Sequence, residues 1–225
     1  MLANIAIDGP AACGKTTVAA LLAQKLGLVY LDTGAMYRAA AWQVLQAGVS
    51  LDDSEAIAAV VKDMALVVRA STRADGHDIL VNGRDITSLL HTPEVTAAVP
   101  AVACVSAVRR DMVRRQQALA AEGGIVMAGR DICTVVLPDA QFKYYIDASL
   151  EERARRRAAD LAASGRTTAV ADVSAQLAER DKTDSGRADS PLMIAADAVR
   201  IDSTSVSAEQ VVARIVADYR GAFPQ

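Results

Sequence analysis

The stretch IAIDGPAACGKTT, residues 5–17, decides the fold. Its apolar start predicts a strand that stops at Asp8-Gly9-Pro10, and Gly14-Lys15-Thr16 falls where a helix is expected to begin. The spacing satisfies GxxxxGK[ST] between a strand and a helix, which is the context of a phosphate-binding loop. In such a loop the backbone N–H groups turn inward around phosphate oxygens, and the following helix N-terminus favours negative charge. The stretch therefore predicts a nucleoside triphosphate site.

Three residues of this loop carry its expected chemistry. Gly14 lets the backbone approach the phosphates, Lys15 places a point charge on the β- and γ-phosphates, and the Thr16 hydroxyl is placed to bind Mg²⁺ directly or through water. The motif alone leaves kinases, GTPases and ATPases open. A GTPase should also carry an NKxD base-reading motif, and the sequence DKTD at residues 181–184 lacks the Asn.

The composition favours a helix-rich protein of one domain, or of one domain with insertions. The chain has 225 residues, of which 52% are hydrophobic, and much of this fraction is alanine, a strong helix former. The net charge is −3 and the pI is about 5.4. A duplex-binding surface carries a basic excess, so we expect no nucleic-acid partner.

The cysteines and the apolar runs bear on location. The three cysteines show no CxxC spacing, which indicates reduced thiols rather than a disulfide framework or a zinc site. The first apolar run is too short for a signal peptide, and no run approaches the length of a transmembrane helix. We expect a cytoplasmic protein without a membrane partner, and nothing in the sequence demands more than a monomer.

Strand-like and helical patterns alternate along the chain, which predicts βαβ units, a parallel sheet and helices on both of its faces. The expected strands are residues 5–7, 28–31, 125–127, 142–146 and 199–201. The expected helices are residues 15–26, 34–46, 101–121, 150–163, 171–181 and 208–220. Residues 66–90 break this rhythm with two β-rich runs and turn signals at Asp75-Gly76 and Asn82-Gly83, the second of which suits a tight hairpin. This segment is predicted to be a small antiparallel insert.

A kinase of small substrates needs several arginines around two phosphorylated ligands. The motif LDTGAMYR, residues 31–38, offers Thr33 and Arg38, and Gly129-Arg130-Asp131 follows a later strand. Because ligands bind beyond the carboxyl ends of parallel strands, both motifs should converge on the phosphate loop. A purely structural role remains the alternative for Arg38, and a local ion pair remains the alternative for Arg130 and Asp131.

The expected helix over residues 101–121 carries four arginines, and its periodicity indicates which of them face solvent. Its apolar stripe consists of Val105, Val108, Met112 and Leu119. At about 100° per residue, Arg110 and Arg114 lie opposite this stripe and should face solvent. Arg109 and Arg115 flank the stripe and can reach over an adjacent crevice.

A third cluster lies in ERDKTDSGR, residues 179–187. Arg180, Asp184 and Arg187 share one helix face, and Asp184 is expected to hold Arg180 by an ion pair. Gly186 predicts the helix end in a mobile segment, as in a lid that closes and excludes water. The alternative is a surface helix whose ion pairs contribute little. Residues 151–157 are expected to begin the same lid, and their arginines are expected to face solvent except for one or two that face in.

Together these motifs resemble the bacterial cytidylate kinase family, a branch of the nucleoside monophosphate kinases. The matching pieces run in family order over almost the whole chain: IAIDGPAACGKTT, LDTGAMYRAAA, VRRDMVRRQ, GRDICTVVLPDA, SLEERARRR, RDKTDSGR and SPLMIAADAVRIDST. The resemblance implies an α/β fold of the P-loop NTPase type, with a five-stranded parallel core, an antiparallel monophosphate-binding insert and a lid. It places the core at about residues 1–32, 101–150 and 190–225, the insert at about 33–100 and the lid at about 151–189. It also implies transfer of the γ-phosphoryl group of ATP to CMP or dCMP, with Mg²⁺.

The resemblance further implies roles for individual residues. ATP is held by Gly9, Pro10, Ala11, Ala12, Cys13, Gly14, Lys15, Thr16 and Thr17, with Thr16 as the metal ligand. The monophosphate is bound by Thr33, Arg38, Arg109, Arg130, Asp131, Arg180, Asp184 and Arg187. Thr33 and Asp131 stand on the nucleoside side, and the acceptor phosphate is gripped by Arg38, Arg109 and Arg130. Asp184 reads the ribose or orients Arg180, and the catalytic residues are Lys15, Arg130, Arg180 and Arg187.

Three departures from the family pattern are visible. Cys133 stands where the family usually has Gly, and Cys13 replaces a more usual Ser or Ala; both cysteines are interpreted as small space-fillers. Ala128 stands where many members carry an acidic residue. A metal-orienting carboxylate would then come from elsewhere, with Asp8 and Asp131 as candidates.

Two alternatives stay open. The first is a phosphate-loop kinase with another acceptor, such as UMP, a different nucleotide or shikimate. The second is a nucleotide-binding regulator with slow or no hydrolysis, against which the separate arginine clusters and the missing NKxD motif count. The sequence does not rank CMP against dCMP or UMP.

Overall fold

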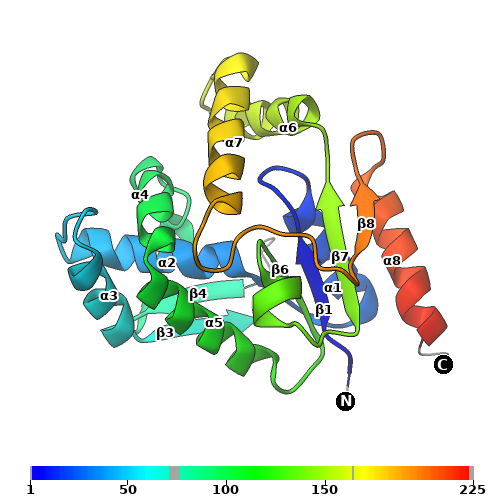
Figure 1. Ribbon diagram of the computed structural model, residues 1–225, viewed down its shortest axis with the longest axis horizontal. Helices are drawn as coiled ribbons and strands as arrows, with labels where there is room; N and C mark the ends of the chain where they lie inside the picture. Colours follow the sequence, from blue (N-terminus) through cyan, green and yellow to red (C-terminus); the bar gives the residue numbers. More distant parts are fainter. Residues whose placement is uncertain (1, 71–76, 164, 223–225) are drawn as a thin grey trace.

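Figure 1 shows the computed structural model of the chain, which describes residues 2–70, 77–163 and 165–222. A five-stranded sheet lies at its centre, in the order β2–β6–β1–β7–β8. The strands are Ile5–Asp8 (β1), Val29–Asp32 (β2), Ile125–Gly129 (β6), Phe142–Asp147 (β7) and Val199–Asp202 (β8). All neighbouring strands of this sheet are parallel, which confirms the predicted fold class.

Helices cover both faces of the sheet because successive side chains of a strand point to opposite faces. Ile5 and Ile7 belong to one hydrophobic cluster, and Ala6 between them belongs to another. The covering helices are Lys15–Leu26 (α1) and Ala208–Ala222 (α8) on the first face, and Thr33–Gln46 (α2) and Ser106–Ala120 (α5) on the second. Within the described residues, no helix is both long enough and apolar enough to span a membrane.

The insert contains helices as well as the predicted antiparallel strands. Its elements are Ser54–Asp63 (α3), Leu66–Ala70 (β3), His77–Val81 (β4), Arg84–Asp85 (β5), the 3₁₀ turn Thr87–Leu89 (η1) and Pro93–Cys104 (α4). The hairpin at Asn82-Gly83 is confirmed, with φ of 50° and 81° at the two turn residues. The turn predicted at Asp75-Gly76 lies outside the described residues. One hydrophobic cluster joins Met127 of the sheet to Ile79 of the insert, so the two share a core.

The single helix predicted over residues 101–121 is wrong. Cys104 ends α4, and the extended backbone of Val105, with ψ of 113°, separates it from α5. The Thr92 side chain caps the start of α4, and Pro93 occupies its first turn. These are the residue types that favour a helix start, and the prediction overlooked them.

The predicted apolar stripe of α5 also needs one correction. Leu119 is 42% exposed, and the polar Gln116 is buried in its stead. Arg109 and Arg115 turn inward as expected, but to different places. Arg115 donates from Nη1 to the carbonyl oxygen of Met64 at 2.9 Å and so ties α5 to the end of α3, away from the phosphate loop.

Two further helices, Leu150–Ala163 (α6) and Val170–Ser185 (α7), stand over the carboxyl ends of the central strands (Figure 1). Helix α7 continues past residue 181 and ends at Ser185, directly before Gly186, which confirms the end predicted from that glycine, and Arg180 and Asp184 both lie in its last turns. The turn after β6 leads into a short π-helical segment, Ile132–Val136 (η2). Such segments are rare and often lie at functional sites.

Candidate active site

A cavity of about 780 Å³ lies where the central strands end. Its lining includes the predicted site residues Ala11, Ala12, Gly14, Lys15, Thr16, Thr17, Thr33, Arg38, Arg109, Arg130, Asp131, Arg180, Asp184 and Arg187. The other predicted loop residues, Gly9, Pro10 and Cys13, belong to the same loop but do not line the cavity. The fold thus brings the phosphate loop, the start of the insert, the turn after β6 and the end of α7 to one place.

The phosphate loop packs closely against the sheet. A Cβ atom added at Gly9 would lie 1.9 Å from the carbonyl oxygen of Ile146, so only glycine fits there. Ala12 and Gly14 have positive φ angles of 60° and 93°. A left-handed alanine is a strained backbone position of the kind that concentrates at functional sites.

Lys15 folds back onto its own loop. Its Nζ donates to the carbonyl oxygen of Pro10 at 2.5 Å and lies 3.4 Å from the Cys13 Sγ. Burial, together with the nearby positive charge of Arg130, lowers the pKa of Lys15 to about 8. A phosphate placed against this ammonium group would favour its charged form, because opposite charge at short range stabilises ionisation.

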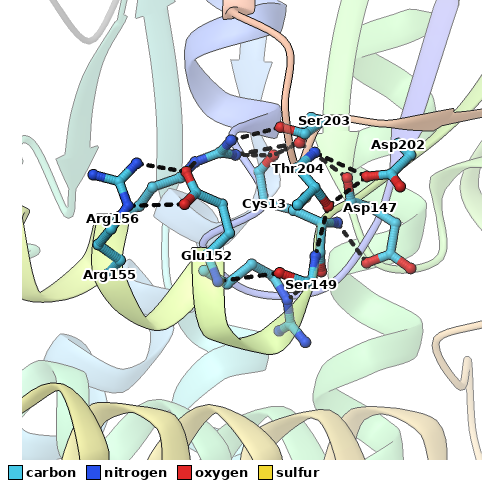
Figure 2. Close-up of polar contacts among 11 residues, drawn as sticks. Cys13, Asp147, Ser149, Glu152, Arg155, Arg156, Asp202, Ser203 and Thr204 are labelled. Atoms are coloured by element: carbon cyan, nitrogen blue, oxygen red, sulfur yellow. Dashed lines mark hydrogen bonds and ion pairs between the residues drawn. The ribbon is translucent and has the colours of Figure 1, made fainter.

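Figure 2 shows how α6 and the residue after β8 support the phosphate loop. Arg156 donates from Nη1 to the Cys13 carbonyl oxygen at 3.4 Å and from Nη2 to the Ser203 carbonyl oxygen at 2.6 Å. The Ser203 hydroxyl donates to the same Cys13 oxygen at 3.0 Å. Glu152 accepts from the Arg156 Nε at 2.8 Å and fixes the guanidinium. The loop backbone is therefore held by two elements that are far from it in the sequence.

Asp184 is the carboxylate at the centre of an arginine cluster. It accepts a hydrogen bond from the Arg130 Nε at 2.8 Å and another from the Arg187 Nη2. The predicted pair between Asp184 and Arg180 is wrong, because Arg130 reaches across from the turn after β6 and Arg187 lies one turn further along the chain. Arg180 faces the cavity instead, where burial and the charge of Arg130 lower its pKa to about 10.

Positive charge exceeds negative charge in this part of the cavity. The lining of the cavity includes four carboxylates, Asp32, Asp131, Asp160 and Asp184, and eight cationic side chains, Lys15, Arg38, Arg109, Arg130, Arg156, Arg157, Arg180 and Arg187. Among the described residues, Arg38 and Arg180 form no ion pair, and burial also lowers the pKa of Arg38. Like charges repel strongly away from bulk water, so a ligand with several phosphate groups would stabilise this arrangement.

The part of the cavity beside α4 has a different character. Arg109 pairs with Asp131 at 2.6 Å, and both side chains are almost fully buried. The Arg109 guanidinium lies 5.3 Å from the centre of the Tyr37 ring. Thr33 donates to the carbonyl oxygen of Ala128 at 2.9 Å. This end offers an aromatic ring and polar groups whose charges are already compensated, which suits a base better than a phosphate.

Asp8, which the sequence suggested only as a metal-orienting carboxylate, ties the end of β1 to the turn after β6. The two carboxylate oxygens of Asp8 accept from the backbone N–H groups of Ile132 at 2.9 Å and Cys133 at 2.7 Å. Burial raises the pKa of Asp8 to about 6, although these hydrogen bonds oppose the shift. The sequence feature that could have indicated this role was a carboxylate at the end of a buried strand. Asp8 is 0% exposed and does not line the cavity, so it does not fit the suggested role of orienting a metal.

Sequence reasoning missed two cavity residues. Tyr37 directly precedes Arg38 in the LDTGAMYR motif, and its buried hydroxyl has no hydrogen-bond partner among the described residues. His77 begins β4, is 4% exposed and lies with its ring centre 5.7 Å from that of Tyr30. The motif could have identified Tyr37, whereas nothing in the sequence around His77 marks it.

The cysteines are free, as predicted. Cys13 and Cys133 are 0% and 2% exposed, which confirms that they fill space in the core. Burial and the neighbouring Asp8 raise the pKa of the Cys133 thiol. This thiol therefore stays protonated and has no nucleophilic character at neutral pH.

Comparison with known proteins gives a consistent picture. The family described as Cytidylate kinase matches residues 5–221. A cytidylate kinase of Geobacillus sp. (strain WCH70) is 48% identical over 95% of this chain and 94% of its own length. A bifunctional pantoate ligase/cytidylate kinase of Synechococcus elongatus is 46% identical over 96% of this chain, which spans 42% of that protein. A solved shikimate kinase from Acinetobacter baumannii, in complex with shikimate, has a TM-score of 0.50 at 16% identity over 100% of this chain and 97% of its own.

Proposed function

This chain belongs to the cytidylate kinase family, and we propose that it transfers the γ-phosphoryl group of ATP to CMP or dCMP, giving ADP and CDP or dCDP. The observation that carries the proposal is the surplus of buried positive charge between the phosphate loop and the pocket beside α4. Arg38 and Arg180 form no ion pair among the described residues, although Asp32 and Asp184 lie near enough to favour their charged forms, and both arginines face the space where two phosphorylated substrates would meet.

The proposed reaction is a direct in-line transfer without a covalent intermediate. Catalysis then consists of positioning and charge stabilisation, because the attacking phosphate oxygen is already anionic. Lys15 contacts the donor phosphates, Arg38 and Arg130 hold the acceptor phosphate, and Arg180 and Arg187 neutralise charge on the group in transfer. We propose that the cytosine lies between Thr33, Arg109 and Asp131, which moves Arg109 from its expected place at the acceptor phosphate because its charge is already paired with Asp131.

Mg²⁺ fits this site only in company with the substrate. Among the described residues no group of three or more His, Cys, Asp or Glu side chains is arranged to hold a metal ion. The exposed Thr16 hydroxyl lines the cavity and supplies one oxygen ligand, and Mg²⁺ is commonly held by few protein oxygens together with phosphates and water. Thr16 would hold the ion, which would supply charge neutralisation for the donor phosphates.

We further propose a cytoplasmic monomer that acts on free nucleotides. The free thiols support the cytoplasmic location, and the acidic pI counts against a nucleic-acid partner. The insert, about residues 33–100, is expected to close on the acceptor, and the lid, about residues 151–189, on the donor.

A coupled assay with ATP–Mg²⁺ and separate acceptors tests the proposal. The acceptor panel consists of CMP, dCMP, UMP, AMP, GMP, TMP and shikimate. We expect fast turnover with CMP and dCMP. Faster turnover with another acceptor would reassign the substrate, and ATP binding without transfer to any acceptor would contradict a kinase.

The lowered pKa of Lys15 leads to a separate prediction about ATP binding. In the free protein its pKa is about 8, and the triphosphate should raise it, because the ammonium gains an anionic partner. At pH 8.5 we expect ATP binding to take up a fraction of a proton and to weaken as the pH rises further. Calorimetry in two buffers of different ionisation heat measures this uptake.

Lys15→Arg is the matched control, because a guanidinium keeps its proton throughout this pH range. Proton uptake should disappear in this variant. Equal uptake by both proteins would mean that another group titrates on binding.

A further inference from the structure

We infer that Arg153 and Asp181 form a positioning pair, which fixes the end of α7 against the phosphate loop and thereby aims Arg180 at the group in transfer. Neither residue touches the cavity, so both act through Arg180. The inference rests on the proposed function, since it assumes that Arg180 acts on the phosphoryl group.

Arg153 joins three separate parts of the molecule. Its Nη1 forms an ion pair with the Asp181 Oδ2 at 2.7 Å and donates to the carbonyl oxygen of Ala11, in the phosphate loop, at 3.3 Å. Its Nε donates to the carbonyl oxygen of Ala148, which follows β7, at 3.0 Å. The side chain is 7% exposed. A planar guanidinium can bridge a carbonyl and a carboxylate in one fixed geometry, and an ammonium group cannot.

Asp181 directly follows Arg180 in α7. Neighbouring residues on a helix project about 100° apart, so fixing one side chain limits the rotation of the other about the helix axis. Arg180 has no ion pair of its own among the described residues, and its aim therefore depends on how α7 is seated. The Asp181 Oδ1 is buried without a hydrogen-bond partner in the described part of the chain. The Oδ2 contact with Arg153 is thus the main anchor of this carboxylate.

A small apolar cluster lies around the same contact. Ala11 of the phosphate loop packs with Ala154 of α6 and with Val173 and Leu177 of α7. The loop and the two lid helices thus share a core of their own, and beside it Arg153 is buried while the Asp181 side chain is 23% exposed. Apolar packing alone would hold these elements together, and removing a charged pair from water is costly. A charged pair at this place is better explained by the orientation that it imposes.

The test uses Asp181→Asn and Arg153→Lys in the full chain, with kcat and KM measured for CMP and ATP. Asparagine keeps an acceptor oxygen but loses the charge. Lysine keeps the charge but loses the planar, forked arrangement of the guanidinium N–H donors. We expect kcat to fall about tenfold in each variant, while KM for CMP changes less than about threefold. The matched controls are Asp172→Asn on exposed α7 surface and Arg155→Lys on exposed α6 surface, and both should retain wild-type kcat. All assays are run well below the melting temperature of each variant.

Combining the substitutions with Arg180→Ala distinguishes an effect on the orientation of Arg180 from a general loss of fold stability. If the pair acts through Arg180, then adding Asp181→Asn to Arg180→Ala should change kcat less than about twofold. Multiplicative losses in the double variant would overturn the inference, as would single variants with kcat within about twofold of wild type. Wild-type protein without CMP transfer would instead overturn the proposed function, and the inference with it. Should Asp181→Asn fail to fold, the same cycle is run with Arg153→Lys.

Discussion

Replacing Arg180 with alanine is expected to lower kcat for CMP phosphorylation by about 10² to 10⁴, while KM for CMP and ATP changes less than about fivefold. The guanidinium lines the cavity, and burial and the charge of Arg130 lower its pKa to about 10. In the free enzyme Asp184 offsets this unfavourable charge only in part, and a negative ligand would offset it further. In the transition state, negative charge lies on the oxygens of the phosphoryl group in transfer, close to Arg180. The stabilisation lost in Arg180→Ala should therefore appear mainly in kcat.

Steady-state kinetics of the wild type, Arg180→Ala and Arg110→Ala measure this effect. Arg110 is the matched control because its side chain is 72% exposed and its nearest carboxylate, Asp189, lies at 4.0 Å. Removing this charge should leave kcat and KM nearly unchanged. A raised KM with an unchanged kcat in Arg180→Ala would assign the arginine to substrate binding and contradict a role in the transition state.

Replacing Asp184 with asparagine is expected to lower the free energy of unfolding by about 3 kcal/mol. The Asp184 side chain is 3% exposed and is bonded to Arg130 and Arg187. Burial disfavours its charge, but the two arginines more than offset this and lower the pKa of Asp184 below its ordinary value. Without the carboxylate, two buried guanidinium groups repel each other in the absence of a counter-charge.

Urea unfolding at pH 7 measures the loss, and Asp189→Asn is the control, since that carboxylate is 45% exposed. The pH dependence has a definite sign. A carboxyl whose pKa is lower in the folded state stabilises the fold above its unfolded pKa of about 3.9 and loses this contribution as the pH falls through the folded pKa. The difference between wild type and Asp184→Asn should therefore shrink below about pH 4. Equal losses in both variants at pH 7 would show that Asp184 contributes no more than a surface charge.

Features that depend on local pattern were predictable from the sequence. The strand-to-helix context of Gly9 to Thr16 gave the phosphate loop, and alternating strands and helices gave the parallel sheet. The turn at Asn82-Gly83 was predictable because that dipeptide adopts positive φ at little cost. The boundary between α4 and α5 was missed, because alanine-rich sequence reads as helix on both sides of Val105, and tertiary packing decides where the break falls.

The pairing of charged side chains was not predictable, because it depends on residues that are distant in the sequence. Spacing along α7 favoured Asp184 with Arg180, yet Arg130 approaches the same carboxylate from a different element. Arg153 and Ser203 gave no local sign of their roles, since they bind backbone atoms 142 and 190 residues away. Periodicity identifies which face of a helix is buried, but not which partner lies against it.

The strand order also constrains the order in which the chain folds during synthesis. The strand β1, which leads into the phosphate loop, lies between β6 and β7, and β2 is paired only with β6. While the ribosome is still producing the first half of the chain, neither of the first two strands has a sheet partner. The carbonyl of Ile146 that packs on Gly9 and the amides that hold Asp8 do not yet exist. The phosphate loop is therefore synthesised first but reaches its final structure among the last elements. A nascent chain acquires its nucleotide site only once β6 and β7 have paired with β1.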